Sequence, residues 1–280
     1  MKKTVISIII PALICGAVLT NCNSNLELDD NGLNAVYSTD NEHIKSISTN
    51  GSITHEYHYD YTGKIVEENS LFYFRKYIYG KNDRLEKTES GFDRNMLSSM
   101  WHELPIEFMT SQNSETDSYS LYTYDATGRL SMIKNYFNET GKAFEYRSMQ
   151  TFEYNGENIS KVNLHEPGGK ITQYHVYDYD KNGNVTIDKY FTNIFNAENT
   201  LQRETVYKYD NYKNPYRIFS KLGSPGLWSN VNNIIETNTT RYEDIPGIDK
   251  YSHSTTTYRY NNEGYPIKEI TGNGEFDYGY

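Results

Sequence analysis

A short motif that recurs along the chain constrains its fold more than any other feature. The clearest copy is the stretch Tyr122–Leu130, which reads Tyr-Thr-Tyr-Asp-Ala-Thr-Gly-Arg-Leu. Its two tyrosines lie two residues apart and therefore project from one face of an extended strand. The Asp-x-x-Gly that follows has the composition of a type I β-turn, and the leucine after it resumes the alternation on a returning strand. The motif therefore predicts a β-hairpin.

The motif occurs about eight times, so the hairpins should form one continuous sheet. Its aromatic pairs are Tyr57/Tyr59, Tyr77/Tyr79, Tyr122/Tyr124, Phe152/Tyr154, Tyr177/Tyr179, Tyr207/Tyr209 and Tyr258/Tyr260, and a degenerate first copy covers 36–47. A common spacing of about 25 to 30 residues fits two strands and two connections. We therefore predict an all-β fold over residues 35–280, a rolled or barrel-like antiparallel meander of about 14–16 strands with one short helix.

The turn residues are the second structural signal. Intact turns are bounded by Asp60 and Gly63, Asp125 and Gly128, and Asp180 and Gly183. The last residue of such a turn often needs a left-handed conformation, which glycine adopts freely and Asn or Asp tolerate. Asp83 stands in the place of glycine in one copy, and Lys213 stands there in another. Lys213 is therefore the one residue that conflicts with the predicted turn.

Two stretches, at about 89–118 and 222–248, interrupt the repeat. Apolar residues of the first share one helical face, with Asp93 as a cap and Pro105 as a stop, so we predict a short amphipathic helix over Asp93–Leu104. The second contains two Pro-Gly pairs and is interpreted as a long loop with room for one strand.

The N-terminus has the features of an export signal. Lys2 and Lys3 precede an apolar run over 5–19, which is too short to span a membrane and suits a signal peptide over 1–21. The run ends in Leu-Thr-Asn-Cys, which resembles the lipobox of bacterial lipoproteins, although Asn21 departs from the usual small residue. This resemblance implies that Cys22 is acylated and that the protein is exported and anchored to the outer membrane, on its periplasmic side or at the cell surface.

The alternative for Cys22 is an ordinary thiol after conventional cleavage. Since Cys15 lies in the leader, the mature chain would then hold a single cysteine and no internal disulfide, which is unusual for an exported protein. Residues 22–34 are polar and acidic without apolar periodicity, and we interpret them as a flexible tether.

The charge excludes one class of partner. The formal charge is −10, and removal of Lys2 and Lys3 with the leader leaves 25 basic against 37 acidic residues, a charge of −12. Such a surface repels a phosphate backbone, so we expect no nucleic-acid partner.

The run Tyr-x-Tyr-Asp-x-x-Gly-x-Leu/Ile resembles the YD repeats of the RHS family, whose repeats roll a continuous β-sheet into a hollow shell. Together with the lipobox and a length of 280 residues, the chain resembles uncharacterised Bacteroidetes lipoproteins with a porin-like β fold. The resemblance covers residues 36–280 and implies an architecture. It implies no catalytic residues, because RHS proteins owe their toxicity to other domains.

Motifs for catalysis and metal binding are absent from the sequence. It has no glycine-rich phosphate loop, nucleophile elbow or paired cysteines. His55 and His58, the closest histidine pair, should point to opposite faces of a strand and share no ion. We therefore expect no metal, no cofactor and no enzymatic activity, and a secreted glycan hydrolase is kept as the second alternative.

The 28 tyrosines admit three interpretations. They form the core of the rolled sheet, or some of them form an exposed surface that stacks on sugar rings, or they belong to an outer-membrane β-barrel, for which the aromatic ending Phe276–Tyr280 is typical. For the second we name Tyr207, Tyr209 and Trp228, which lie beside irregular connections. The sequence thus favours a lipid-anchored, non-catalytic binding or structural module of the cell envelope, with a carbohydrate or another envelope protein as partner; the first alternative is the outer-membrane barrel.

Overall fold

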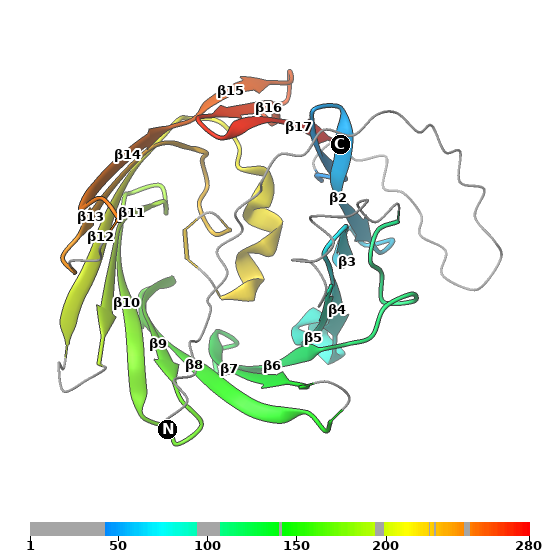
Figure 1. Cartoon of the computed structure of the whole chain (residues 1–280), viewed down its shortest axis with the longest axis vertical. Helices are drawn as coiled ribbons and strands as arrows, with labels where there is room; N and C mark the ends of the chain where they lie inside the picture. The colour runs from blue at the N-terminus through cyan, green and yellow to red at the C-terminus, as the bar shows by residue number, and fades with distance from the viewer. Residues whose placement is uncertain are drawn as a thin grey trace.

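The computed structural model is a ring of antiparallel strands that encloses one short helix (Figure 1). The structure describes residues 43–93, 107–139, 142–193, 199–223, 225–226, 228–243 and 247–280. The predicted all-β antiparallel meander is confirmed, and the described residues form 17 strands in place of the expected 14–16. The predicted signal peptide, Cys22, the tether and nearly all of the predicted helix Asp93–Leu104 lie outside the described residues.

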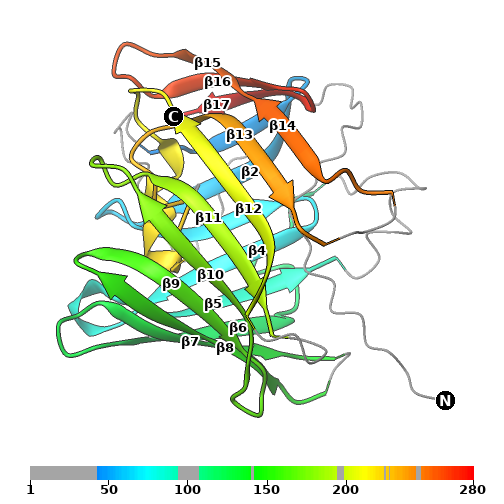
Figure 2. The same ribbon diagram turned by 90° about the vertical axis from the view of Figure 1, so that its left-hand side faces the viewer.

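The strands follow one another around the ring in chain order, as the side view also shows (Figure 2). They are β1 (Ser46–Thr49), β2 (Ser52–Tyr59), β3 (Ile65–Ser70), β4 (Tyr73–Tyr79), β5 (Leu85–Phe92), β6 (Ser118–Tyr124), β7 (Leu130–Phe137), β8 (Glu145–Asn155), β9 (Asn158–His165), β10 (Ile171–Tyr179), β11 (Val185–Thr192), β12 (Thr200–Tyr209), β13 (Ile234–Arg241), β14 (Tyr251–Thr255), β15 (Thr257–Tyr260), β16 (Pro266–Thr271) and β17 (Gly274–Gly279). Two 3₁₀ segments, η1 (Lys81–Asp83) and η2 (Pro215–Leu222), complete the described elements.

The last strand closes the ring on the first. Residues Ser46 to Thr49 of β1 pair with β17 on one side and with β2 on the other. Strands β14 and β15 follow directly on each other, with Thr256 between them; β14 pairs with β13, and β15 pairs with β16. This change of partner divides one long strand into two and accounts for one of the strands beyond the expected number.

The repeated turns are held by their aspartate. In the turn after β6 the Asp125 carboxylate accepts hydrogen bonds from the backbone N–H groups of Thr127 and Arg129, both at 2.9 Å. The backbone N–H of Gly128 donates to the Asp125 carbonyl at 3.0 Å, and Gly128 has φ +90°. Asp60 and Asp180 make the same backbone contacts. An acceptor side chain at the first position and a left-handed residue at the fourth therefore define this turn.

The positions that lack glycine behave in two ways. Asp83 adopts φ +60°, as its place at the end of a turn requires. Lys213 is not among the described residues with positive φ, so the conflict expected there does not exist. The reason is that Lys213 is not the last residue of a four-residue turn. Its backbone N–H donates instead to the carbonyl of Gly264, which lies in another turn, at 3.0 Å.

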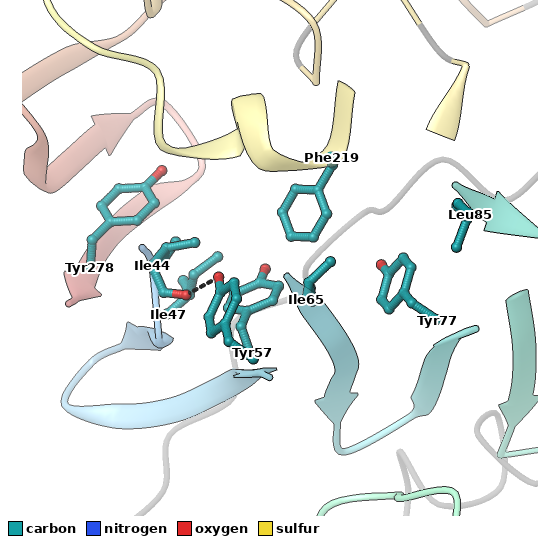
Figure 3. Close-up of a cluster of buried hydrophobic side chains, with 9 residues drawn as sticks. Ile44, Ile47, Tyr57, Ile65, Tyr77, Leu85, Phe219 and Tyr278 are labelled. Carbon is teal, nitrogen blue, oxygen red and sulfur yellow. Dashed lines mark hydrogen bonds between the residues drawn. The ribbon is translucent and has the colours of Figure 1, made fainter. Parts of the chain in front are cut away.

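The paired aromatic residues face the interior of the ring. Tyr57 contacts Phe219 of η2, with ring centroids 5.5 Å apart, and η2 lies inside the ring (Figures 1 and 3). Tyr59, two residues further, shares this face and is 7% exposed. One core cluster surrounds Phe219, and a second is formed by Leu130, Ile133, Phe152 and Val162 with tyrosines packed against them. The interpretation of the tyrosines as core residues thus describes most of the pairs.

A hydrogen bond from a tyrosine hydroxyl joins most neighbouring units, and we call it the inter-unit tyrosine bond. Its acceptor is the backbone carbonyl of a residue at, or within two positions of, the start of an earlier strand. The donors and acceptors are Tyr59 and Ile44, Tyr124 and Leu85, Tyr154 and Leu130, Tyr179 and Ile159, Tyr209 and Val185, Tyr258 and Ile234, and Tyr280 and Pro266. Burial raises the pKa of Tyr124 to about 12, so its hydroxyl stays protonated and donates at neutral pH.

Charged side chains occupy the opposite, outer face of the strands. Glu153 alternates with Phe152 and Tyr154, and its carboxylate lies 3.2 Å from the ammonium of Lys161 on the next strand. Further cross-strand pairs join Lys208 to Glu236 at 2.9 Å and Lys268 to Asp277 at 2.8 Å. In the part of the chain that the structure describes, no helix has the length and apolar character needed to cross a membrane.

Candidate functional site

The helix inside the ring belongs to an insertion within one of the repeated turns. Asp210 follows Tyr209 as Asp125 follows Tyr124, and its carboxylate accepts from the backbone N–H of Tyr212 at 3.0 Å. The turn is nevertheless completed by Asn233, whose N–H donates to the Asp210 carboxylate at 3.1 Å while its carbonyl accepts from the Asp210 N–H at 3.1 Å. In the intact turn after β6, Arg129 makes both contacts. Residues 211–232 are therefore an insertion that leaves the frame of the turn in place.

The insertion begins with a capped helix. The Asn214 side chain accepts a hydrogen bond from the N–H of Tyr216 at 3.0 Å, and Pro215 occupies the first position of η2. Gly223 ends the helix in a left-handed conformation with φ +74°. A Cβ on Gly223 would lie 2.6 Å from Leu130 and 2.9 Å from Phe152, so the helix end fits directly against the second core cluster.

A pocket of about 530 Å³ lies between the insertion and the turn-bearing ends of β5 to β11. Gly128 and Gly183 contribute from two of the repeated turns, and Asn158 contributes from β9. Arg217 and Ser220 of η2 form the opposite wall, followed by Pro225, Ser229 and Val231. Tyr124, Tyr154 and Tyr179 line the same space. The pocket thus combines hydroxyl, amide and aromatic groups from five separate segments.

Three arginines line this pocket, and their surroundings differ. Arg129 is bound to its own turn, with Nε 3.0 Å from the Asp125 carboxylate, and its guanidinium covers the Tyr154 ring at 4.6 Å. Arg84 covers the Tyr124 ring at 5.3 Å. Arg217 is exposed on η2. Among the described residues, neither Arg84 nor Arg217 forms an ion pair with a carboxylate.

The acidic lining residues are fewer. Asp83 is paired with Lys64, whose ammonium lies 2.6 Å from its carboxylate. Glu157 is the second acidic residue of the lining. Asp83 and Arg129 each form an ion pair with a residue outside the pocket, Lys64 and Asp125 respectively. The charged lining residues that form no such pair with another described residue are Arg84, Arg217 and Glu157. The pocket is therefore locally positive on a chain whose net charge is −10.

The ligand-binding candidates from the sequence do not line the pocket. Tyr209 is half-buried and donates its hydroxyl to the Val185 carbonyl. Burial and, to a lesser extent, the nearby Asp188 carboxylate raise the pKa of Tyr207 to about 12. Trp228 packs edge-on against Phe219, with ring centroids 4.8 Å apart. All three side chains are partly buried, because they pack inside the ring. They therefore do not form the open surface for stacking on sugar rings that was expected from the sequence.

The pocket residues carried only weak signals in the sequence. Asn214-Pro215 followed by Gly223 is typical of the start and end of a helix. The pattern is hard to recognise because it lies where the tyrosine repeat is interrupted. The expected insertion at 222–248 overlaps the real one only in part, since the insertion begins at 211 and β13 occupies Ile234–Arg241. The lining residues extend from Asp83 to Val231, so no local pattern could bring them together.

Comparison with known proteins yields only distant structural similarity. No family model and no curated protein matches the chain. A porin-like protein from Bacteroides uniformis is 12% identical, with a TM-score of 0.38, and the match covers 84% of this chain and 97% of that one. A porin-like protein from Bacteroides vulgatus is 10% identical, with a TM-score of 0.37 and coverages of 85% and 98%.

The third similarity is to a much larger protein. A chain of the Tc holotoxin pore of Photorhabdus luminescens is 13% identical, with a TM-score of 0.26, and the match covers 78% of this chain but only 12% of the toxin chain. TM-scores of this size support no statement about function. The site is therefore interpreted from its own geometry.

Proposed function

We propose that the protein is a non-catalytic binding module of the cell envelope, held by a lipid on Cys22, and that it captures a polyhydroxylated ligand such as an oligosaccharide. The pocket of about 530 Å³ is the observation that carries this proposal. Its size suits a small sugar unit. Its serine and asparagine side chains can bind hydroxyl groups, and its tyrosine side chains can contact the apolar side of a sugar ring.

The outer face supports a lipid-anchored module over a spanning barrel. A lipid-exposed band needs apolar side chains, and a charged residue at its centre costs about 2–4 kcal/mol. The strands here present cross-strand ion pairs outward, for example Lys161 with Glu153 and Lys208 with Glu236. Such pairs are suited to water.

The carboxylates of the pocket support a binding role over a hydrolytic one. A glycosidase needs two free carboxyl groups on opposite sides of the scissile bond. Here Asp83 is held by Lys64 at 2.6 Å, which leaves Glu157 as the unpaired carboxylate among the described lining residues. Incubation with the oligosaccharides that bind should therefore release no shorter products.

Fractionation tests the anchor. The Cys22→Ala variant should be folded and soluble in the periplasm, because the described strands present charged pairs such as Lys161 with Glu153 on their outer face. If this variant still sediments with membranes and resists alkaline extraction, the outer-membrane barrel replaces the present proposal.

Titration tests the pocket. A Trp101→Phe background leaves Trp228, which adjoins the lining residue Ser229, as the single tryptophan reporter. Oligosaccharides at millimolar concentration should produce a saturable fluorescence change. Ser220→Trp should abolish binding, measured by calorimetry, because Ser220 is exposed and lines the pocket; Ser254→Trp, at an exposed site on β14 outside the lining, should not. Absence of saturable binding in the folded protein across neutral and acidic oligosaccharides would refute the proposed function.

A further inference from the structure

Two of the three arginines in the pocket are available to a ligand. Arg129 is engaged by the Asp125 carboxylate at 3.0 Å and also donates to the Gly156 carbonyl at 3.4 Å. Arg84 extends over the adjacent turn, because a Cβ on Gly128 would lie 2.4 Å from its Nη2. Arg217 projects from η2 on the opposite wall. These two guanidinium groups thus come from different segments and border one cavity.

Their charge is not balanced within the described part of the site. Asp83 is neutralised by Lys64, and Glu157 alone remains against Arg84 and Arg217. A locally positive pocket on a strongly acidic chain needs an explanation, because scattered surface arginines would normally find carboxylates nearby. Guanidinium groups bind carboxylates through two parallel N–H···O bonds, and this geometry suits Arg better than Lys.

We propose that the ligand of this pocket carries a carboxylate, as in an oligosaccharide of uronic acids, and that Arg84 and Arg217 bind this carboxylate. The inference rests on the proposed function, since it concerns the same pocket. Asn158, Asn182 and Ser220, which also line it, then remain for the sugar hydroxyls. The covering of the Tyr124 ring by Arg84 at 5.3 Å holds this guanidinium near the pocket wall before the ligand arrives.

The test compares two trisaccharides of equal length, one of galacturonic acid and one of galactose, by calorimetry at low salt. The acidic trisaccharide should bind about tenfold more tightly, the equivalent of about 1.4 kcal/mol, and its affinity should fall as salt is added. Arg217→Gln should remove about this tenfold advantage, so that the affinity for the acidic trisaccharide falls by a larger factor than the affinity for the neutral one. Arg217→Lys should recover only part of the advantage, because an ammonium group lacks the planar pair of donors.

Controls separate the outcomes. Arg259→Gln, at an exposed site on β15 outside the pocket, should change neither affinity, and circular dichroism should show that each variant is folded. Equal affinities for both sugars, with no effect of Arg217→Gln, would overturn this inference and leave the proposed function intact. Binding of neither sugar would remove both. A sulfated galactose trisaccharide that binds more tightly than the uronic acid, with the same dependence on Arg217, would overturn the assignment of a carboxylate.

Discussion

The inter-unit tyrosine bond predicts a measurable stability cost for the loss of a single oxygen atom. Tyr154→Phe removes the hydroxyl that donates to the Leu130 carbonyl at 2.8 Å and keeps the ring that Arg129 covers. A neutral hydrogen bond contributes about 0.5–1.5 kcal/mol, and a buried acceptor left unpaired costs about 1–3 kcal/mol. Since Leu130 is only 8% exposed, we expect a loss of about 1–2 kcal/mol in the free energy of unfolding.

Urea unfolding followed by circular dichroism provides the measurement, with the slope of the transition compared between variants. The matched control is Tyr136→Phe, because the Tyr136 ring stacks on Tyr119 at 4.6 Å and its hydroxyl has no partner among the described residues. This control should change stability by less than about 0.5 kcal/mol. If Tyr154→Phe costs no more than the control, the tyrosines contribute through their rings alone and the reasoning is wrong.

Three further predictions concern turns and the helix end. Gly128→Val and Gly169→Val should each destabilise by more than about 1 kcal/mol in urea unfolding, because both glycines have φ near +90°; an unchanged Gly128→Val protein would mean that the turn tolerates another conformation. Gly223→Ala should lower the melting temperature more than Gly169→Ala, because its new Cβ would lie 2.6 Å from Leu130 whereas that of Gly169 meets nothing within 4 Å; equal shifts would contradict the close fit. The Thr127 hydroxyl, backbone N–H groups and Arg129 hold the pKa of Asp125 well below its usual range, so its contribution is present above about pH 4 and is lost as the pH falls further. Asp125→Ala should therefore be less stable than the wild type at neutral pH and should lose less stability on acidification. If urea unfolding at a series of pH values shows the same loss of stability below pH 4 in both proteins, this reasoning is wrong.

The local part of the fold could be predicted from the sequence because its causes are local. The Asp125 carboxylate binds N–H groups two and four residues ahead, and the alternation of Tyr122 and Tyr124 assigns one face of a strand. These contacts lie within the motif itself. The strand order then follows from the shortness of the connections.

The tyrosine acceptors and the pocket could not be predicted in this way. Tyr154 and the Leu130 carbonyl are 24 residues apart, and nothing in either stretch identifies the other. The same holds for the insertion, since the residue that completes the Asp210 turn, Asn233, lies 23 residues further along the chain. Trp228 is a further contact of this kind. Its neighbours in the sequence, Gly, Pro and Ser, favour an exposed side chain, but in the fold its ring packs on Phe219.

The closure of the insertion by Asp210 and Asn233 has a consequence for how such chains can vary. Because Asp210 and Asn233 are hydrogen-bonded to each other as Asp125 and Arg129 are in an uninterrupted turn, the pairing of β12 with β13 does not depend on the length of the segment between them. Lengthening a loop whose ends are already fixed costs only about 0.6 kcal/mol per doubling. The Asp-x-x-Gly turn is thus a site at which a longer segment can enter the interior of the ring while the strands on either side stay in register.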